Sequence, residues 1–340
     1  MQHFHVPGVS VTEFDAGEVV RSRCFGTLEM GSRKDVTDGS MFHACSISKM
    51  IAALCVLRLA QEGLLDLDGE ANAYLTSWKI PDNPFTGEKK ITIANLLAHQ
   101  AGFHDPEGSF EPYNCKGRLP NVIDILRGTT IYHPGEIAPR CRPETEFAYS
   151  DAGYCVLAQI AEDVTGETIP QIAQKRIFLP LGLTHTFFWA NNQEIDLAHC
   201  AAGHDQAGEI VSGTRACYPN VEGAGLWSTP NELALIVLDI IKAYHGEGAN
   251  VLNQTMARAM LTPHGCVNFM GLGVFLGDDD GAPYFFSQGW GVGMQCKLRA
   301  YHQGQSGVVV MTNSEPGMEQ DRALVGEIIG DVCNDGMKKR

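Results

Sequence analysis

The segment CSISKMIAALCVLRLAQEG, residues 45–63, decides the fold of this chain. From Ile47 to Ala60 its residues are apolar on nearly every side of a helix, and Arg58 is the one strong exception. A helix that is apolar on all faces is a buried one. Gly63 follows where a glycine commonly ends a helix. We therefore expect this helix to lie in the core, with the rest of the chain packed around it.

Two polar residues stand at the start of this helix. Ser46 and Lys49 are three positions apart, so they share a helix face. A serine hydroxyl is a poor nucleophile until a base takes its proton. Burial would lower the pKa of Lys49 and make a neutral amine available as that base. An ordinary N-cap serine beside a solvated lysine fits the four residues equally well, but a helix this apolar offers Lys49 no solvent face.

Strand patterns occur at both ends of the chain. Residues 8–15 alternate as a strand does, residues 18–28 form a second candidate, and Asp15-Ala16-Gly17 would close a hairpin. Further strands are predicted near the other end, at 270–276, 283–287, 294–301 and 307–313.

Helical patterns and loops fill the rest of the chain. Helices are predicted at Thr92–His99, Asp151–Thr165, Ile169–Ile177, Pro230–Ala243 (capped by Ser228 or Thr229) and Met318–Cys333. Residues 102–120 and 132–146, which are rich in Gly, Pro and Asn, are predicted to be surface loops over a site.

These patterns predict an α+β fold, in which both chain ends form an antiparallel sheet flanked by helices around a mostly helical insertion. We expect residues 1–75 and 216–340 to form the sheet domain and residues 76–215 the mainly helical domain. The active site would lie at their junction.

Charge excludes some classes of partner. The formal net charge of the 340 residues is -15, whereas nucleic-acid binding needs a basic face. Anionic membranes are disfavoured for the same reason. The one basic cluster, Lys338-Lys339-Arg340, is expected to be a solvated end. We expect a small-molecule partner, with no nucleic acid and no membrane.

The cysteines and the N-terminus indicate the compartment. The 11 cysteines form no CxxC pair, and a chain of this length folds without a disulfide framework, so reduced thiols are expected. Residues 1–11 lack the features of a signal peptide, which favours a cytoplasmic location; a trimmed secreted chain would look the same. His99, His104 and Asp105 come nearest to a zinc site, but no metal or cofactor is expected.

A second motif lies at Tyr149-Ser150-Asp151. A tyrosine beside a positive group ionises more easily and can relay protons. The ordinary alternative is a turn that opens the helix from 151 to 165, with Asp151 as its N-cap.

The ordered segments carry a resemblance to a known family. Residues 42–49 (FHACSISK), 91–102 (ITIANLLAHQAG), 146–154 (EFAYSDAGY) and 177–183 (IFLPLGL) resemble the successive signatures of the class C β-lactamase-like, or penicillin-binding-protein-like, serine hydrolases. Residues 223–229 (GAGLWST) and 271–273 (GLG) fit as well. This family also includes D-aminopeptidases, DD-carboxypeptidases and family VIII carboxylesterases.

The resemblance implies roles for individual residues. Ser46 would be the acylated nucleophile, Lys49 its proton acceptor, and Tyr149 the group that shuttles the proton to the leaving group. Asp151 stands where the family usually has an asparagine that contacts the lysine and the substrate. A carboxylate there would raise the pKa of Lys49 and work against its role as a base.

A third motif departs further from the family. The stretch 286–293 (FSQGWGVG) matches a Lys-Thr-Gly or His-x-Gly strand at Gly289, but Ser287 replaces the cation and Gln288 follows it. By resemblance, the N–H groups of Ser46 and Trp290 form the oxyanion hole, and Gly289 lets the substrate approach. A lost charged hydrogen bond costs about 1.5–3 kcal/mol of substrate-carboxylate binding. Ser287 and Gln288 are equally explained as plain strand residues.

These residues leave three functions open. A metal-free serine hydrolase acting on a small ester or amide is favoured, and esterase or D-aminopeptidase chemistry fits better than efficient β-lactamase chemistry. A binding or sensory protein that acylates without turnover is the second, and an acyltransferase the third. Cys45 is a rival nucleophile with His43 nearby, but it cannot face Lys49 together with Ser46, so we expect it to be packed.

Overall fold

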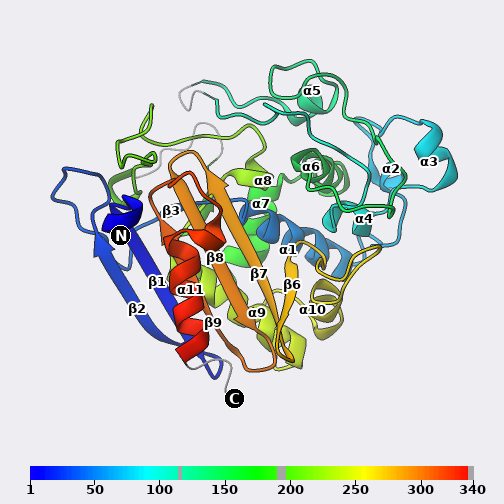
Figure 1. The fold of residues 1–340 in the computed structure, drawn as a ribbon. Helices are drawn as coiled ribbons and strands as arrows, with labels where there is room; N and C mark the ends of the chain where they lie inside the picture. The colour runs from blue at the N-terminus through cyan, green and yellow to red at the C-terminus, as the bar shows by residue number, and fades with distance from the viewer. Residues whose placement is uncertain (114–116, 190–196, 336–340) are drawn as a thin grey trace.

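The two ends of the chain meet in one six-stranded antiparallel sheet with the order β2-β1-β9-β8-β7-β6 (Figure 1). The structure, a computed structural model, describes residues 1–113, 117–189 and 197–335. The strands of this sheet are β1 (Gly8–Asp15), β2 (Glu18–Gly26), β6 (Phe275–Asp279), β7 (Ala282–Gly291), β8 (Met294–Tyr301) and β9 (Ser306–Thr312). A smaller antiparallel sheet has the order β3-β5-β4, with β3 (Phe42–Cys45), β5 (Leu226–Ser228) and β4 (Phe187–Phe188).

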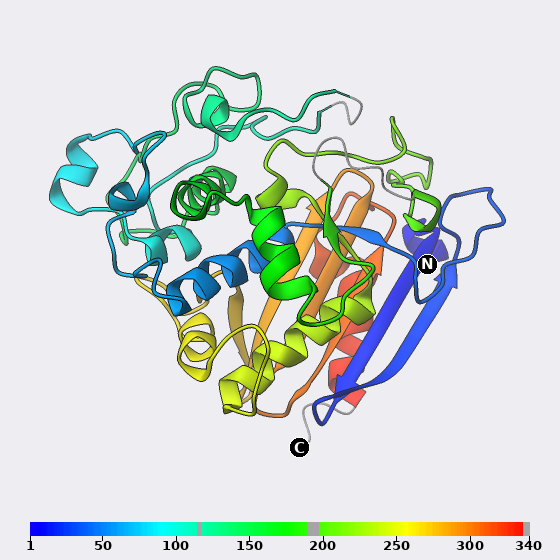
Figure 2. The same cartoon turned by 180° about the vertical axis from the view of Figure 1, so that it is seen from behind.

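Helices cover both faces of the large sheet. The helix α11 (Leu324–Asp335) packs on β8 and β9 and lies in front of the sheet in Figure 1. The helix α9 (Pro230–His245) packs on the opposite face, against β1 and β9, and lies in front of the sheet in Figure 2, which shows the molecule from behind. Strand β1 is therefore buried on both faces along most of its length, although its sequence alternates. The antiparallel sheet, its helices and the helical segment between them confirm the predicted α+β fold class.

The remaining helices lie between β3 and β6 in the sequence. They are α1 (Ser48–Gln61), α2 (Ala71–Tyr74), α3 (Pro84–Glu88), α4 (Ile93–Leu97), α5 (Val122–Leu126), α6 (Asp151–Thr165), α7 (Ile169–Ala173), α8 (Val221–Ala224) and α10 (Gln254–Met260). A π-helical turn, Gln174–Phe178, continues α7. Three short 3-10 turns are Gln2–Phe4, Leu197–His199 and Gln320–Arg322.

The helix α1 occupies the core, as its sequence predicts. Every residue from Ser48 to Leu57 is buried, and the helix packs against α6, α7, α8 and α10. Arg58 is tolerated near its end because the guanidinium donates hydrogen bonds to the carbonyl of Val251 and to the Glu62 carboxylate. The apolar run thus fixes the position of its first turn, which carries Lys49.

Several predicted boundaries shift in the structure. Strand β6 begins at Phe275 rather than at 270, and β7 continues to Gly291, so the third motif is strand up to Gly291 and then turns into β8. The closing helix starts at Leu324, after the separate 3-10 turn. The N-cap of α6 is Ser150, whose hydroxyl accepts the Gly153 N–H, and not Asp151, because Asp151 is the first helical residue.

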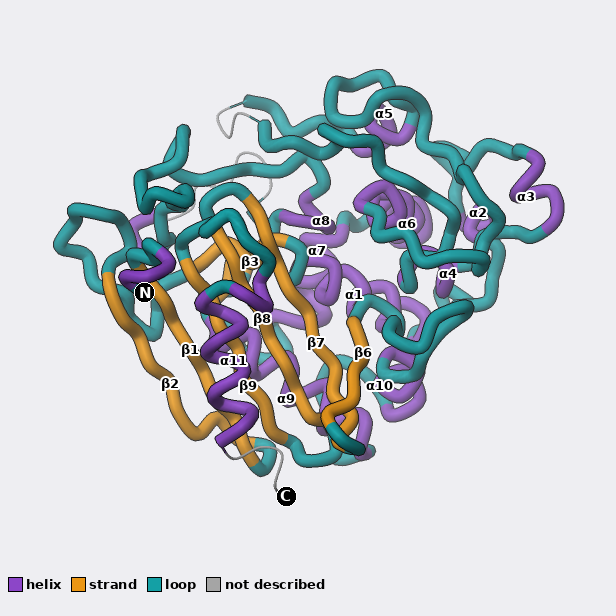
Figure 3. The backbone as a smooth tube through the Cα atoms, viewed as in Figure 1, coloured by secondary structure: helices purple, strands orange, loops and turns teal. Residues whose placement is uncertain are grey.

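Other predictions on the loops and caps are met. Thr92 and Thr229 cap α4 and α9. The described parts of 102–120 and 132–146 are loops, drawn in teal in Figure 3. The proposed boundaries at 75, 76, 215 and 216 between two domains remain a prediction. The cluster Lys338-Lys339-Arg340 lies outside the described residues.

Among the described cysteines, Cys217 differs from expectation. Cys217 is disulfide-bonded, so the prediction that all thiols are reduced is wrong at this position. Cys45, Cys141 and Cys296 are among the free thiols. Sequence could not indicate the bond because the cysteines are spread without a recognisable spacing.

No helix in the described ranges combines the length and the apolar character that crossing a membrane requires.

Candidate active site

Ser46 lies in the turn that joins β3 to α1, half-buried at the helix entrance. The Ser48 hydroxyl holds this turn, because it donates to the Cys45 carbonyl and accepts the Leu226 N–H of β5. Lys49 stands in the first turn of α1 and is 3% exposed. Its ammonium lies 3.4 Å from the Ser46 hydroxyl oxygen, as the three-residue spacing predicts.

The buried Lys49 ammonium is compensated from two sides. Its Nζ lies 2.7 Å from Oδ1 of Asp151 and donates to the Gly223 carbonyl at 2.9 Å. The same carboxylate oxygen accepts a hydrogen bond from the Asn220 amide. Burial is the largest single influence on the pKa of Lys49 and would lower it, but the charges and hydrogen bonds of Asp151 and Tyr149 together outweigh burial and raise the pKa. Lys49 therefore stays charged at neutral pH, and the neutral amine expected from burial alone does not form.

Tyr149 completes the group around Ser46. The residue is 39% exposed, and its hydroxyl interacts with Ser46 and Lys49. The Lys49 Nζ lies 4.9 Å from the ring centroid. Burial of the hydroxyl raises the pKa of Tyr149 although the Lys49 charge opposes this effect. The phenol is consequently neutral at rest.

His99 supports Tyr149 from behind. The two rings stack with centroids 4.4 Å apart, and the His99 Nδ1 accepts the Ser150 N–H at 3.1 Å. Burial, reinforced by the Lys49 charge, lowers the pKa of His99 to about 3, so this imidazole is neutral. Asp105 holds the next residues, since its carboxylate accepts hydrogen bonds from the Ser150 hydroxyl and the Asp151 N–H at the start of α6.

A pocket of about 300 Å³ opens over this group. Ser46, Asp151 and Trp290 line it, so the structure brings together predicted residues from three distant segments. Glu111 and Glu315 add two further carboxylates to its wall. Among the described lining residues there is no lysine or arginine, so the negative charges of the wall favour a cationic group on the substrate.

The third motif lies along β7 and divides between the two faces of the strand. Ser287 and Gly289 face inward: Ser287 is opposite Leu298 in the core, and a Cβ at Gly289 would lie 2.3 Å from the Ala44 carbonyl. This close approach of β7 to β3 is a packing reason for the glycine. Gln288 pairs with Lys297 on the other face. The structure thus places Ser287 and Gln288 apart, and their contact with substrate stays a prediction.

Cys45, the rival nucleophile, is buried as predicted. Its sulfur lies 3.4 Å from the His43 Nδ1, and of the two candidate nucleophiles it is Ser46 whose side chain contacts Lys49. Burial opposes ionisation, but hydrogen bonding with Cys296 and the charge of His43 outweigh it and lower the pKa of the thiol. Cys45 also borders the pocket, so its role needs an experimental control.

The sequence did not predict the site residues that lie in irregular segments. Asn220 binds Asp151, and Tyr218 accepts the Val292 N–H at 2.8 Å through its hydroxyl. Glu111 and Glu315 lie in loops without periodicity. For Asn220, the sequence signal that could have indicated a place in the site is its position three residues before the Gly223 motif.

Glu222 is a further missed residue, buried directly behind the site. It precedes Gly223, whose carbonyl binds Lys49, and its Oε1 has no hydrogen-bond partner among the described residues. Burial raises the pKa of Glu222 from 4.5 to about 7. A carboxyl in such surroundings is neutral at acidic pH and costs stability when it ionises.

Comparison with known proteins identifies a family and structures with the same fold. The Beta-lactamase family model matches residues 1–328. Protein flp of Staphylococcus aureus (strain MRSA252) is 27% identical over 233 residues, which make up 68% of this chain and 43% of that protein. The chain spans less than half the length of the curated relatives it matches.

Two solved structures share the fold. A D-amino acid amidase from Ochrobactrum anthropi SV3, complexed with L-phenylalanine, superposes with a TM-score of 0.78 at 20% identity, over 98% of this chain and 94% of that one. An octameric penicillin-binding protein homologue from Pyrococcus abyssi has a TM-score of 0.74 at 21% identity, over 93% of this chain and 72% of that one.

The Lys49–Asp151 pair generates a prediction about pH. In Asp151→Asn the pKa of Lys49 falls because its negative partner is lost, so the ammonium deprotonates at lower pH. We expect the alkaline limb of the kcat/KM profile to move to lower pH, while Glu18→Gln, an exposed charge control on β2, leaves the profile unchanged. An increase in activity near neutral pH, with the acidic limb moved downward, would show instead that Lys49 acts as a neutral base.

Glu222 generates a prediction about stability. Its folded pKa lies above the 4.5 of an ordinary carboxyl, so it destabilises the fold increasingly as pH rises from 4.5 to about 7. Relative to wild type, Glu222→Gln should gain up to about 3 kcal/mol of unfolding free energy between pH 5 and pH 8. Urea unfolding at both pH values measures this gain. Glu162 is an exposed carboxylate that lines a cavity of about 100 Å³ together with Glu222, and Glu162→Gln should show no such gain. Equal pH dependence in all three proteins would refute the assignment.

Proposed function

Because the chain belongs to the Beta-lactamase family, we propose that it is a serine hydrolase that forms an acyl-enzyme on Ser46. The observation that carries this proposal is the contact of the Ser46 hydroxyl with both the Lys49 ammonium and the Tyr149 hydroxyl beside an open pocket. The family match agrees with the resemblance in the sequence. Ser46, Lys49 and Tyr149 are the proposed catalytic residues.

The proton route follows from the charge states at the site. Lys49 is charged and Tyr149 is neutral, so neither is a free base at rest. We place Tyr149 as a relay: when the Ser46 oxygen attacks the carbonyl, Tyr149 accepts the Ser46 proton and gives its own to the leaving group. A water molecule then attacks the ester, and the reverse relay returns a proton to Ser46. The Lys49 ammonium stays in place and stabilises negative charge on the oxygens.

The negatively charged oxygen that forms when Ser46 attacks the substrate carbonyl would be held by backbone N–H groups at the pocket. Ser46 and Trp290 both line it, one at the entrance to α1 and the other in β7. Their backbone N–H groups are the proposed donors, in agreement with the family pattern.

The charge of the pocket narrows the proposed substrate class. Asp151, Glu111 and Glu315 surround the opening, and Ser287 stands where the family has a cation that would hold a carboxylate. Substrates with a carboxylate, such as penicillins, are therefore disfavoured. We propose a small amide or ester whose acyl group carries a free amine, the class to which D-amino-acid amides belong. A related fold is seen in the D-amino acid amidase.

The nucleophile is tested by acyl trapping. Wild type should hydrolyse a p-nitrophenyl ester or a D-amino-acid amide with turnover and show an acyl adduct by intact mass. Ser46→Ala should lose about a thousandfold or more in kcat/KM and form no adduct. Cys45→Ala should still form it, because its sulfur faces His43.

Two outcomes would refute this assignment. Full activity in Ser46→Ala, or loss of the adduct in Cys45→Ala alone, would transfer the role to the thiol. A single stoichiometric adduct without turnover would favour the binding or sensory function.

The substrate amine is tested by a charge change in the pocket wall. Glu315→Gln should raise KM for a D-amino-acid amide about threefold to tenfold, because a partly exposed charge contact is lost. The N-acetylated amide, which has no cation, should bind the two proteins equally. An equal increase for both amides would show that Glu315 shapes the pocket and does not recognise the amine.

A further inference from the structure

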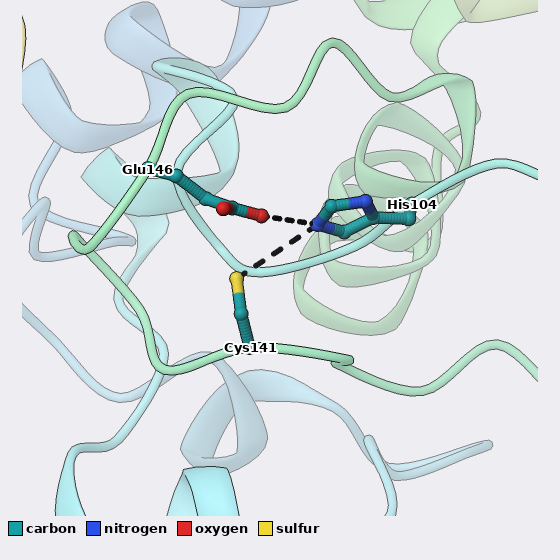
Figure 4. A group of neighbouring side chains, drawn as sticks. All are labelled: His104, Cys141 and Glu146. Atoms are coloured by element: carbon teal, nitrogen blue, oxygen red, sulfur yellow. Dashed lines mark hydrogen bonds and ion pairs between the residues drawn. The ribbon is translucent and has the colours of Figure 1, made fainter.

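Three metal-binding side chains meet at a second place, outside the pocket that Ser46 lines. His104, Cys141 and Glu146 offer a nitrogen, a sulfur and an oxygen that all lie within 4.8 Å of one another (Figure 4). The His104 Nε2 is 2.5 Å from the Glu146 Oε1 and 3.9 Å from the Cys141 sulfur. Figure 4 shows all three side chains pointing toward a common centre from two loop segments.

The donor set matches what zinc prefers. Zinc binds Cys, His and carboxylate ligands at about 2.0–2.3 Å, which places the donor atoms of a tetrahedral site roughly 3.3–3.8 Å apart. The observed sulfur-to-nitrogen distance is close to this range. The Glu146 oxygen must withdraw by about 1 Å, and it is free to turn because its side chain is 48% exposed. His104 is 45% exposed, so water can take the fourth position.

The two loop segments are already held together by their backbones. The Arg140 N–H donates to the Gly102 carbonyl at 2.7 Å, and Gly102 has a φ of +81°. A Cβ at Gly102 would lie 2.3 Å from the Cys141 carbonyl, so only glycine permits this approach. Further along, the Ala148 N–H donates to the His99 carbonyl at 2.9 Å. The ligands are thus brought near one another before any ion arrives.

We propose that His104, Cys141 and Glu146 form a zinc-binding site that ties the loop at 103–105 to the segment 141–149. Glu146 is three residues before Tyr149, and His104 precedes Asp105, which caps α6 at Asp151. The ion therefore reinforces the two segments that position Tyr149 and Asp151. On binding, the Cys141 thiol loses its proton to solvent and the thiolate coordinates the metal.

An exposed His–Glu pair with a thiol that only hydrogen-bonds with its neighbours is the competing explanation. Such a pair adds little stability. The site predicted as nearest to zinc from sequence, His99 with His104 and Asp105, is not formed, because His99 stacks on Tyr149 and Asp105 caps α6. Cys141 is therefore the residue that separates the two explanations.

The test uses the full chain, treated with a chelator and then titrated with Co²⁺ or Zn²⁺. Wild type should bind one equivalent of Co²⁺ with a thiolate-to-cobalt charge-transfer absorption, and Zn²⁺ should displace it. Cys141→Ser and His104→Gln should lose this absorption. Cys24→Ser, which changes another partly buried thiol on β2, should retain it.

Thermal unfolding gives a second measurement that does not depend on hydrolysis. Zn²⁺ should raise the Tm of wild type and Cys24→Ser in a concentration-dependent way, but not that of Cys141→Ser or His104→Gln. Matching circular dichroism spectra of the four metal-free proteins show that the variants fold. Equal metal binding by wild type and Cys141→Ser would overturn the proposal, as would the absence of a thiolate band in wild type.

Discussion

A single ammonium group buried inside an apolar helix is the constraint on which this structure depends. Lys49 belongs to α1, whose neighbouring residues are buried, so its charge cannot reach water. An unpaired charge in such a place costs several kcal/mol. The structure compensates it with the Asp151 carboxylate from α6 and the Gly223 carbonyl from α8. Three helices that are distant in sequence are thereby fixed around one atom, next to Ser46.

The contact between Asp151 and Lys49 also sets the charge states of the groups in the site. Asp151 holds the proton on Lys49, so Lys49 works as a fixed positive charge. Tyr149 is a neutral group that interacts with Ser46 and can both accept and donate a proton. His99, neutral and stacked against the ring, keeps the phenol in place without competing for the proton. The proposed relay through a neutral phenol is consistent with these charge states.

The sequence predicted the features that depend on residues close together in the chain, and it did not predict most contacts between distant segments. The helix α1, the β1–β2 hairpin and the proximity of Ser46 to Lys49 depend on residues close in the chain, and their periodicity indicated them. The meeting of Tyr149 and Asp151 with Lys49 was accessible only through resemblance. Asn220 and Glu315 arrive from irregular segments, whose paths depend on tertiary packing. His99 shows the same limit: it is near His104 in sequence, but its left-handed φ of 56° turns the chain and sends the two side chains to different sites.

Position 287 holds a serine where the family has a cation, although a lysine, Lys297, lies on the neighbouring strand. Lys297 lies on β8, the neighbouring strand, in the pair with Gln288. Because side chains alternate across a sheet, this pair occupies the face opposite to Ser287. The Lys297 ammonium is bound there by Asp321 and lies over the Phe286 ring. A shift of one residue in register would move it to the other face. The register of β7 on β8 thus keeps this positive charge on the face opposite to Ser287, where Asp321 neutralises it.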